Sequence, residues 1–150
     1  SPGSSGGALV DARGAVVGIT TVIAVSEVGA EGLGFATPIE IAREVANDII
    51  RWGRARHGRL GIRGQDALDK FLPPTHSAGV LVKSVDPAGP SNIGGVQAGD
   101  VIVELDGQPV PDMGALVVGA RMLEPGKLAT LRVWRDNQLL TVTVEVGELR

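Results

Sequence analysis

Ser5 is the residue of this sequence whose surroundings most suggest covalent chemistry. It stands third in the pentapeptide Gly3–Gly7, which reads GSSGG and satisfies the pattern Gly-x-Ser-x-Gly. A serine hydroxyl becomes a nucleophile when a positioned base accepts its proton. In one structural context of this pattern the serine lies between a strand and a helix, but residues 8–10 and 15–23 predict a β-hairpin instead. The pattern is compatible with a nucleophile in another setting or with a glycine-serine linker.

The bases and ligands that a nucleophile or a metal would need are scarce. The sequence contains no cysteine and only two histidines, His57 and His76, both far along the chain from Ser5. Cysteine nucleophiles, disulfides and thiolate zinc sites are therefore excluded, and two histidines are too few for a histidine-built metal centre. We expect no metal and no cofactor, and we expect neither histidine to activate Ser5.

The composition is that of a folded protein rich in turns. Of 150 residues, 22 are glycine, 43% are hydrophobic and 3% are aromatic, with a formal net charge of −3. So much glycine favours short strands over long helices, because an interior glycine costs a helix roughly 1 kcal/mol. The acidic balance argues against nucleic acid as a partner, and no apolar run reaches the ~20 residues of a membrane span. The sequence begins without methionine or a targeting segment, so we expect it to be part of a longer protein.

Two groups of elements would position the candidate residues. In the first group, the hairpin is followed by a short strand at 34–37 and by a helix from Pro38 to Trp52, in which apolar residues recur at helical spacing. The second group has a helix with Asp112 as N-cap that ends near Leu123. Its strands are predicted at 80–85, 101–105, 128–134 and 139–146. We interpret the basic stretch 51–59 as a helix end and linker rather than a nucleic-acid contact. The predicted organisation is a unit at 1–52, a linker at 53–58 and a unit at 59–150.

The first unit resembles the trypsin-like protease domain of the HtrA/DegP family. The resemblance rests on residues 2–10 (PGSSGGALV), 14–20 (GAVVGIT) and 32–38 (GLGFATP), which follow the family's order and gaps. It implies that Ser5 is the nucleophile and that the backbone N–H groups of Gly3 and Ser5 form the oxyanion hole. It also implies that Thr20, Thr21 and Val22 lie beside the substrate backbone, and that the loop 24–32 borders the specificity pocket. The family's histidine and aspartate precede the serine, so this chain alone is expected to be inactive.

The second unit resembles a PDZ domain of the kind joined to these proteases. The motifs that carry the resemblance are RLGI at 59–62, GVLV at 79–82, AGDVI at 98–102 and LDGQPV at 105–110. Residues 91–95 depart from the family's Ala-Ala-x-Ala-Gly, so they give no support of their own for a short helix there. The segment GLGF at 32–35 spells a PDZ carboxylate loop but belongs to the protease resemblance, because a helix rather than a PDZ motif follows it.

The PDZ resemblance implies a peptide site at residues 59–62. A peptide C-terminus would add as a strand beside residues 62–65, its carboxylate bound by the N–H groups of Leu60, Gly61 and Ile62. Its last side chain would enter a pocket completed by the predicted helix, whose contributing residues are Leu116, Ala120 and Leu123. The helix residues are equally compatible with an ordinary core. Arg59 would assist the carboxylate by its charge or remain solvated.

The resemblances imply a mainly β fold with α-helices: an incomplete trypsin-like β-barrel segment followed by a PDZ domain, a small barrel or sandwich with two helices. They imply the C-terminal portion of a serine endopeptidase acting on unfolded or misfolded proteins, in which the PDZ domain binds hydrophobic peptide C-termini. The family implies an extracytoplasmic location, an upstream protease segment and trimers in the parent protein. The alternative is a stand-alone peptide-binding PDZ module that carries a non-catalytic protease remnant.

Overall fold

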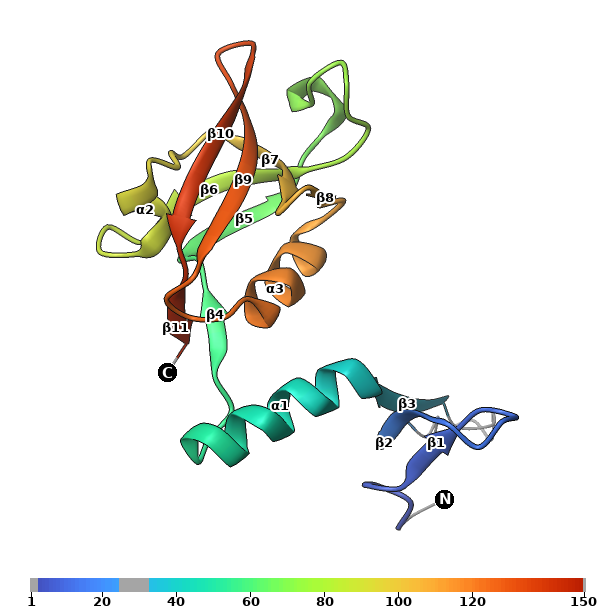
Figure 1. Cartoon of the computed structure of the whole chain (residues 1–150). Helices are drawn as coiled ribbons and strands as arrows, with labels where there is room; N and C mark the ends of the chain where they lie inside the picture. The colour runs from blue at the N-terminus through green and yellow to red at the C-terminus, as the bar shows by residue number, and fades with distance from the viewer. Residues whose placement is uncertain (1–2, 25–32, 150) are drawn as a thin grey trace. The chain divides into compact units, whose positions relative to one another are not determined.

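The computed structural model describes residues 3–24 and 33–149. The chain divides into two compact units, Ser1–Ala55 and Arg56–Arg150 (Figure 1). The first contains β1 (Ala8–Val10), β2 (Val16–Ala24), β3 (Leu33–Pro38) and α1 (Ile39–Trp52). The second contains β4 (His57–Arg59), β5 (Ile62–Asp66), the 3₁₀ turn η1 (Asp69–Phe71), β6 (Val80–Val85), α2 (Pro90–Gly94), β7 (Val101–Leu105), β8 (Gln108–Pro109), α3 (Met113–Met122), β9 (Leu128–Arg135), β10 (Gln138–Glu145) and β11 (Gly147–Leu149).

The first unit is an antiparallel sheet in the order β1-β2-β3 followed by one helix. The tight turn between β1 and β2 is held by Asp11, whose carboxylate accepts hydrogen bonds from the N–H groups of Arg13 (2.8 Å) and Ala15 (3.0 Å). Between Thr20 and Val22 the register of β2 against β3 shifts by one residue, a bulge at Thr21 that re-aims the backbone. The predicted hairpin is present.

Helix α1 begins directly after Pro38 and ends at Gly53, which adopts the left-handed conformation with φ of 73°. None of its residues is buried, although the apolar residues recur on one face. Within residues 3–21 and 34–55, for which side-chain exposure is described, only Gly18 is buried. The exposed apolar side chains include Phe35 (56% exposed) and Ile50 (80%).

The second unit is built on a six-stranded sheet in the order β10-β9-β7-β6-β5, with β8 paired to β7. A separate two-stranded sheet joins β11 to β4. Strands β9 and β10 form a long hairpin (red in Figure 1) across Asp136 and Asn137, whose φ values of 49° and 60° are those of a type I′ turn. Asparagine and aspartate tolerate this conformation better than most residues, which agrees with the turn predicted there.

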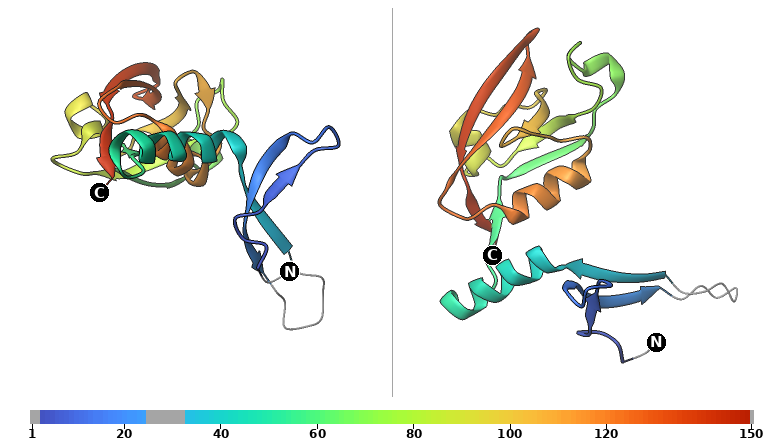
Figure 2. Two further views of the ribbon diagram at one scale, coloured as in Figure 1. Left: turned by 60° about the horizontal axis from the view of Figure 1, so that its bottom comes forward. Right: turned by 45° about the vertical axis from the view of Figure 1, so that its right-hand side comes forward.

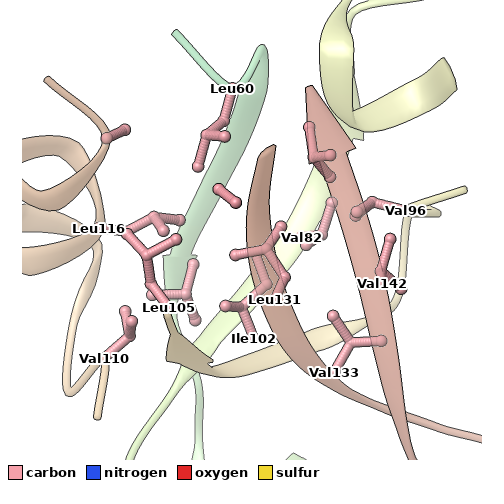
Figure 3. Packing of buried hydrophobic residues seen from close by; sticks show 14 of the residues in the cluster. Leu60, Val82, Val96, Ile102, Leu105, Val110, Leu116, Leu131, Val133 and Val142 are labelled. Atoms are coloured by element: carbon pink, nitrogen blue, oxygen red, sulfur yellow. The ribbon is translucent and has the colours of Figure 1, made fainter. Parts of the chain in front are cut away.

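The core of the chain lies in this second unit. Buried side chains from the sheet and from α3 point toward one another, as Figure 3 shows for Leu60, Val82, Ile102, Leu105, Leu116 and Leu131. Fifteen buried residues form this cluster, from Leu60 to Val146. Burying an aliphatic side chain of this size contributes about 1.5–3 kcal/mol, so this unit contains its own source of stability.

A buried ion pair organises the turn before β7. Asp100 is 1% exposed and accepts two hydrogen bonds of 2.7 Å from the Arg135 guanidinium and one of 2.9 Å from the Gln97 N–H. Arg135 also donates to the Gly95 carbonyl at 2.8 Å. The carboxylate raises the pKa of Arg135, chiefly through these hydrogen bonds. Asp100 belongs to the AGDVI motif, and this network is the physical reason for an aspartate there.

The prediction of a mainly β fold with helices is confirmed, although the sheets of the described residues are open paths rather than closed barrels. The helices at α1 and α3 and the strands β6 and β7 begin and end at or next to the predicted residues. Two segments differ. Residues 57 and 58, expected in the linker, lie in β4 because their backbone pairs with β11. The short helix left without support at 91–95 is present as α2, begun by Pro90 and ended by Gly95.

No helix among the described residues combines the length and apolar character needed to cross a bilayer. The described residues also contain no cluster of three or more acidic or histidine side chains arranged to hold a metal ion.

Candidate functional site

A groove of about 630 Å³ lies in the second unit between β5 and α3. The two elements run side by side in Figures 1 and 2. The groove brings together most residues predicted for peptide binding. Those lining it from the β4–β5 segment are Arg59, Leu60, Gly61 and Ile62, and those from α3 are Leu116 and Ala120. Leu123 does not line the groove, because it follows the last residue of α3 and packs against the core instead.

The backbone at Leu60 and Gly61 is turned so that its N–H groups are available to a ligand. The Leu60 carbonyl accepts from the Ser91 N–H (3.0 Å) and the Gly61 carbonyl from the Asp86 N–H (2.9 Å). Across a trans peptide the C=O and the following N–H point in opposite directions. The N–H groups of Gly61 and Ile62 therefore point away from Ser91 and Asp86. Gly61 makes this turn possible, since its φ of 74° disfavours any residue with a Cβ.

Strand β5 presents an unpaired edge to the groove. It is the last strand of the six-stranded sheet, and its inner neighbour is β6. Ile62 lies opposite Val85 of β6, and the hydrogen bond beside this pair runs from the Asp86 N–H to the Gly61 carbonyl. Ile62 and Val85 are therefore a non-hydrogen-bonded pair of the antiparallel ladder. The N–H and C=O of Ile62 therefore point outward from the sheet. Such an edge can accept a further extended strand.

Helix α3 is held at a fixed distance from this edge at both of its ends. At its start, Asp112 accepts from the Ala115 N–H (2.7 Å) as the predicted N-cap, and Asp66 at the end of β5 accepts from the Met113 N–H (2.8 Å). At its end, Gly58 of β4 packs so closely that a Cβ would lie 2.2 Å from the Ala120 carbonyl oxygen. These contacts set the width of the groove.

An ion pair at the mouth of the groove was not predicted. The Arg59 guanidinium, expected to meet the ligand or the solvent, forms a salt bridge with Asp86 in the loop after β6. The hydrogen bond from Arg59 lowers the pKa of the Asp86 carboxyl, with a further contribution from the Ala88 N–H. The sequence indicated Asp86 only as part of a strand-closing Asp-Pro turn. The arginines Arg63 and Arg121, which also line the groove, gave no signal of a role in the sequence.

The Ser5 segment of the first unit forms a compact turn on β2. The Gly7 N–H donates to the Ser4 carbonyl (3.0 Å), and the Gly6 N–H donates to the Thr20 carbonyl (2.8 Å). The Thr20 hydroxyl donates to the Ser4 carbonyl as well. Because the Ser4 carbonyl is directed at these partners, the N–H of Ser5 points the opposite way.

The Ser5 hydroxyl donates to the Thr21 carbonyl at 2.8 Å. The structure thus brings Ser5, Thr20 and Thr21 together, and Val22 pairs through its backbone with Phe35 of β3. Gly3 lies in the turn before Ser4 with a φ of 94°. Residues 1–55 contain no histidine, so no imidazole of this unit can accept the Ser5 proton. Of the loop expected at 24–32 to border a specificity pocket, residues 25–32 lie outside the described residues.

Comparison with known proteins places these two sites in context. A family model of the PDZ domain matches residues 58–146. The chain belongs to the PDZ domain family. It is 37% identical over 152 residues to a protein of Halomonas elongata named probable periplasmic serine endoprotease DegP-like. The aligned region covers 99% of this chain and 32% of that protein. It is 33% identical over 149 residues to the periplasmic serine endoprotease DegP of Escherichia coli, covering 97% of this chain and 31% of that protein.

Solved structures of HtrA-type proteases have the same fold as this PDZ-containing chain. The HtrA-type protease AlgW with tripeptide matches with a TM-score of 0.76 and 36% identity, over 100% of this chain and 51% of that one. The serine endoprotease from Yersinia pestis matches with a TM-score of 0.62 and 30% identity. This match covers 95% of this chain and 47% of that one. The predicted membership in the HtrA family is confirmed. The chain spans about a third of the length of its curated relatives.

Proposed function

We propose that this chain is the C-terminal portion of an HtrA-type serine endopeptidase acting on unfolded or misfolded proteins, and that its PDZ domain captures their apolar C-termini. One observation carries the binding part of this proposal. The unpaired edge of β5 faces a groove that α3 closes on the other side, and the N–H groups of Gly61 and Ile62 are directed away from the protein's own acceptors.

In the proposed complex the peptide adds to β5 as an antiparallel strand. Its terminal carboxylate accepts hydrogen bonds from the N–H groups of Leu60, Gly61 and Ile62. Its last side chain packs on apolar residues that line the groove, namely Leu60, Ile62, Leu116 and Ala120. Arg59, already paired with Asp86, fixes the shape of the loop and contributes little free charge of its own.

In the proposed catalytic reaction the Ser5 oxygen attacks a substrate carbonyl while its proton passes to a histidine. The N–H groups of Gly3 and Ser5 donate to the oxyanion that forms, and the amine leaves with the proton returned by the histidine. The bond from Ser5 to Thr21 must break for this step. The histidine must come from a segment other than residues 1–55, which contain none, and the family resemblance implies the same for its aspartate. Thr20, Thr21 and Val22 lie on β2, where they would border the substrate backbone.

The names of the relatives support an extracytoplasmic location for the parent protein, since several are periplasmic endoproteases. Polypeptides with exposed apolar C-termini are the proposed partners. The parent protein is proposed to form trimers, as the family resemblance implies.

The peptide site is tested by comparing a peptide that has a free C-terminal carboxylate with the same peptide as its C-terminal amide. Fluorescence anisotropy with the full chain should show at least tenfold tighter binding of the free acid, because hydrogen bonds to a charged group contribute about 1.5–3 kcal/mol. Equal affinities would remove the assignment of residues 60–62 as the carboxylate loop.

The role of Ser5 is tested by fluorophosphonate labelling of the native protein in extracts of its source. The endopeptidase proposal predicts that Ser5 is labelled there and that the isolated chain is not. The stand-alone PDZ module predicts no label in either preparation. The Ser5→Ala variant is the matched control, since it removes only the hydroxyl.

A further inference from the structure

The groove between β5 and α3 is basic, whereas the chain as a whole is acidic. Three arginines line the groove, Arg59, Arg63 and Arg121, against one acid, Asp86, which leaves two positive charges in excess. The formal net charge of the chain is −3. Arg59 is paired with Asp86, but neither Arg63 nor Arg121 forms a salt bridge with any residue that the structure describes. The excess charge therefore belongs to these two side chains.

The two unpaired arginines lie at different places along the groove. Arg63 is the second residue of β5, directly after Ile62. Arg121 lies in the last turn of α3, the end of the helix that packs against Gly58. Arg121 is thus near the 58–61 end of the groove, where the terminal carboxylate would bind. Arg63 lies one residue beyond Ile62 along β5, the strand to which the peptide would add.

The direction of the backbone at Ile62 sets the register of an added strand. Because the N–H and C=O of Ile62 point outward, they pair with the last residue of the ligand, whose carboxylate accepts from the N–H and whose own N–H donates to the C=O. The next-to-last residue then stands directly opposite Arg63. Residues opposite each other on antiparallel strands have their side chains on the same face, with Cβ atoms about 4.5–5.5 Å apart.

The two faces of β5 are chemically distinct at this point. Ile62 is partly buried and packs against the core, and Arg63 is exposed on the opposite face. The cross-strand neighbour of Arg63 on β6 is Ser84, which is exposed and uncharged. The charge of Arg63 also contributes to lowering the pKa of Asp86, but the side chain that donates a hydrogen bond to the Asp86 carboxylate is Arg59. The face beside Arg63 thus has a cation and no acid directly opposite it.

From this geometry, and resting on the proposed peptide-binding function, we infer that the groove selects C-termini whose next-to-last residue is aspartate or glutamate. Arg63 is the specificity-determining residue. The last residue of the ligand is apolar, as its pocket requires. Arg121 attracts the terminal carboxylate of any ligand and does not distinguish the next-to-last residue.

Two acetylated hexapeptides test this inference. They end in the same apolar residue with a free carboxylate and differ only by glutamate or glutamine at the next-to-last position. Anisotropy titrations of the full chain at low salt should give two- to fivefold tighter binding of the glutamate peptide, the range for partly exposed ion pairs. The difference should shrink at high salt, because screening weakens such a pair.

Three variants assign the effect to a side chain. Arg63→Gln should bring the two peptides to equal affinity, whereas Arg121→Gln should weaken both by the same factor. Lys70→Gln removes a charge outside the groove and should change neither. Equal binding of both peptides to the unmodified chain, or a preference that survives Arg63→Gln, would overturn the inference. If neither peptide binds, the proposed peptide-binding function itself fails.

Discussion

The two units of this chain differ in how they keep their candidate functional residues in place. The groove of the second unit rests on a cluster of fifteen buried residues, and both ends of α3 are tied to neighbouring strands. The Ser5 turn of the first unit rests on a three-stranded sheet in which only Gly18 is buried among the residues whose exposure is described, 3–21 and 34–38. Its side-chain hydrogen bonds are exposed and join residues 4–7 to Thr20 and Thr21 of β2. Geometry at the groove is thus supported by packing, and geometry at Ser5 by a few polar contacts.

This difference indicates how the two proposed functions depend on the rest of the protein. A peptide site that the second unit stabilises by itself can work without the first unit. The turn proposed to be catalytic needs its sheet and helix covered, and the exposed apolar side chains of β1, β3 and α1 provide a surface for such a cover. Covering that surface would contribute about 25 cal/mol per Å² of apolar area removed from water.

The largest expected effect is a difference in amide exchange between the two units of the isolated chain. Strands β6, β7 and β9 should exchange only with opening free energies of roughly 5 kcal/mol or more, and β1–β3 and α1 at about 2 kcal/mol or less. Mass spectrometry after timed deuteration measures both. Protection in residues 3–24 as strong as in β7 would contradict the expected difference in stability between the two units.

The Asp100–Arg135 pair gives the next effect. Asp100→Ala leaves the partly exposed Arg135 guanidinium with the Gly95 carbonyl as its acceptor and should lower the free energy of unfolding of the second unit by about 1.5–3 kcal/mol. Urea denaturation followed by Trp134 fluorescence measures it, and Trp52→Phe in the background removes the other tryptophan. Asp11→Ala breaks an exposed pair in the first unit and should leave this transition unchanged.

Gly61→Ala should act on both stability and binding. The left-handed φ of 74° costs a residue with a Cβ about 1–2 kcal/mol. If the loop relaxes to avoid this strain, the N–H groups of residues 61 and 62 turn away from the ligand, and peptide affinity falls about tenfold. Gly126→Ala is the matched control, since Gly126 has a φ of 87° but lies outside the groove. It should lose similar stability and keep its affinity, and equal losses of affinity would contradict this assignment.

Ser91→Ala is expected to stabilise the protein. The Ser91 side chain is fully buried, and its Oγ has no hydrogen-bond partner among the residues that the structure describes. Removing an unsatisfied buried hydroxyl should raise the free energy of unfolding by about 1 kcal/mol, while the Ser91 N–H continues to donate to Leu60. A lower unfolding midpoint for the variant would show that the hydroxyl is satisfied in solution.

The smallest effect concerns Asp86. Its pKa is lowered by the hydrogen bond from Arg59, so the stabilising pair is fully present above the ordinary carboxyl value near 4 and is lost as the pH falls through the lowered pKa. Carbon-detected NMR titration should give Asp86 a pKa below that value, and Arg59→Leu should raise it. An unchanged pKa in the variant would mean that Arg59 does not hold this carboxyl.

Local signals predicted much of the fold. Pro38 and the apolar spacing after it marked α1, Asp112 marked the start of α3, and Asp136-Asn137 marked the β9–β10 turn, since each acts within a few residues. The pairing of β4 with β11 had no such signal, because it joins residues about 90 positions apart. The Arg59–Asp86 pair was missed for the same reason. Leu123 was expected in the groove because its spacing places it on the same helical face as Leu116 and Ala120. The spacing does not show that the helix ends at Met122, one residue before Leu123.

We propose that ligand capture belongs to the groove of the second unit and not to the Ser5 turn. It is tested most directly by titrating the full chain with an apolar C-terminal peptide and following every backbone amide by NMR. We expect the largest shifts at the N–H groups of Gly61 and Ile62, smaller shifts along β5 and α3, and none between Gly3 and Thr21. Shifts centred on residues 3–21, with residues 60–62 unmoved, would contradict it.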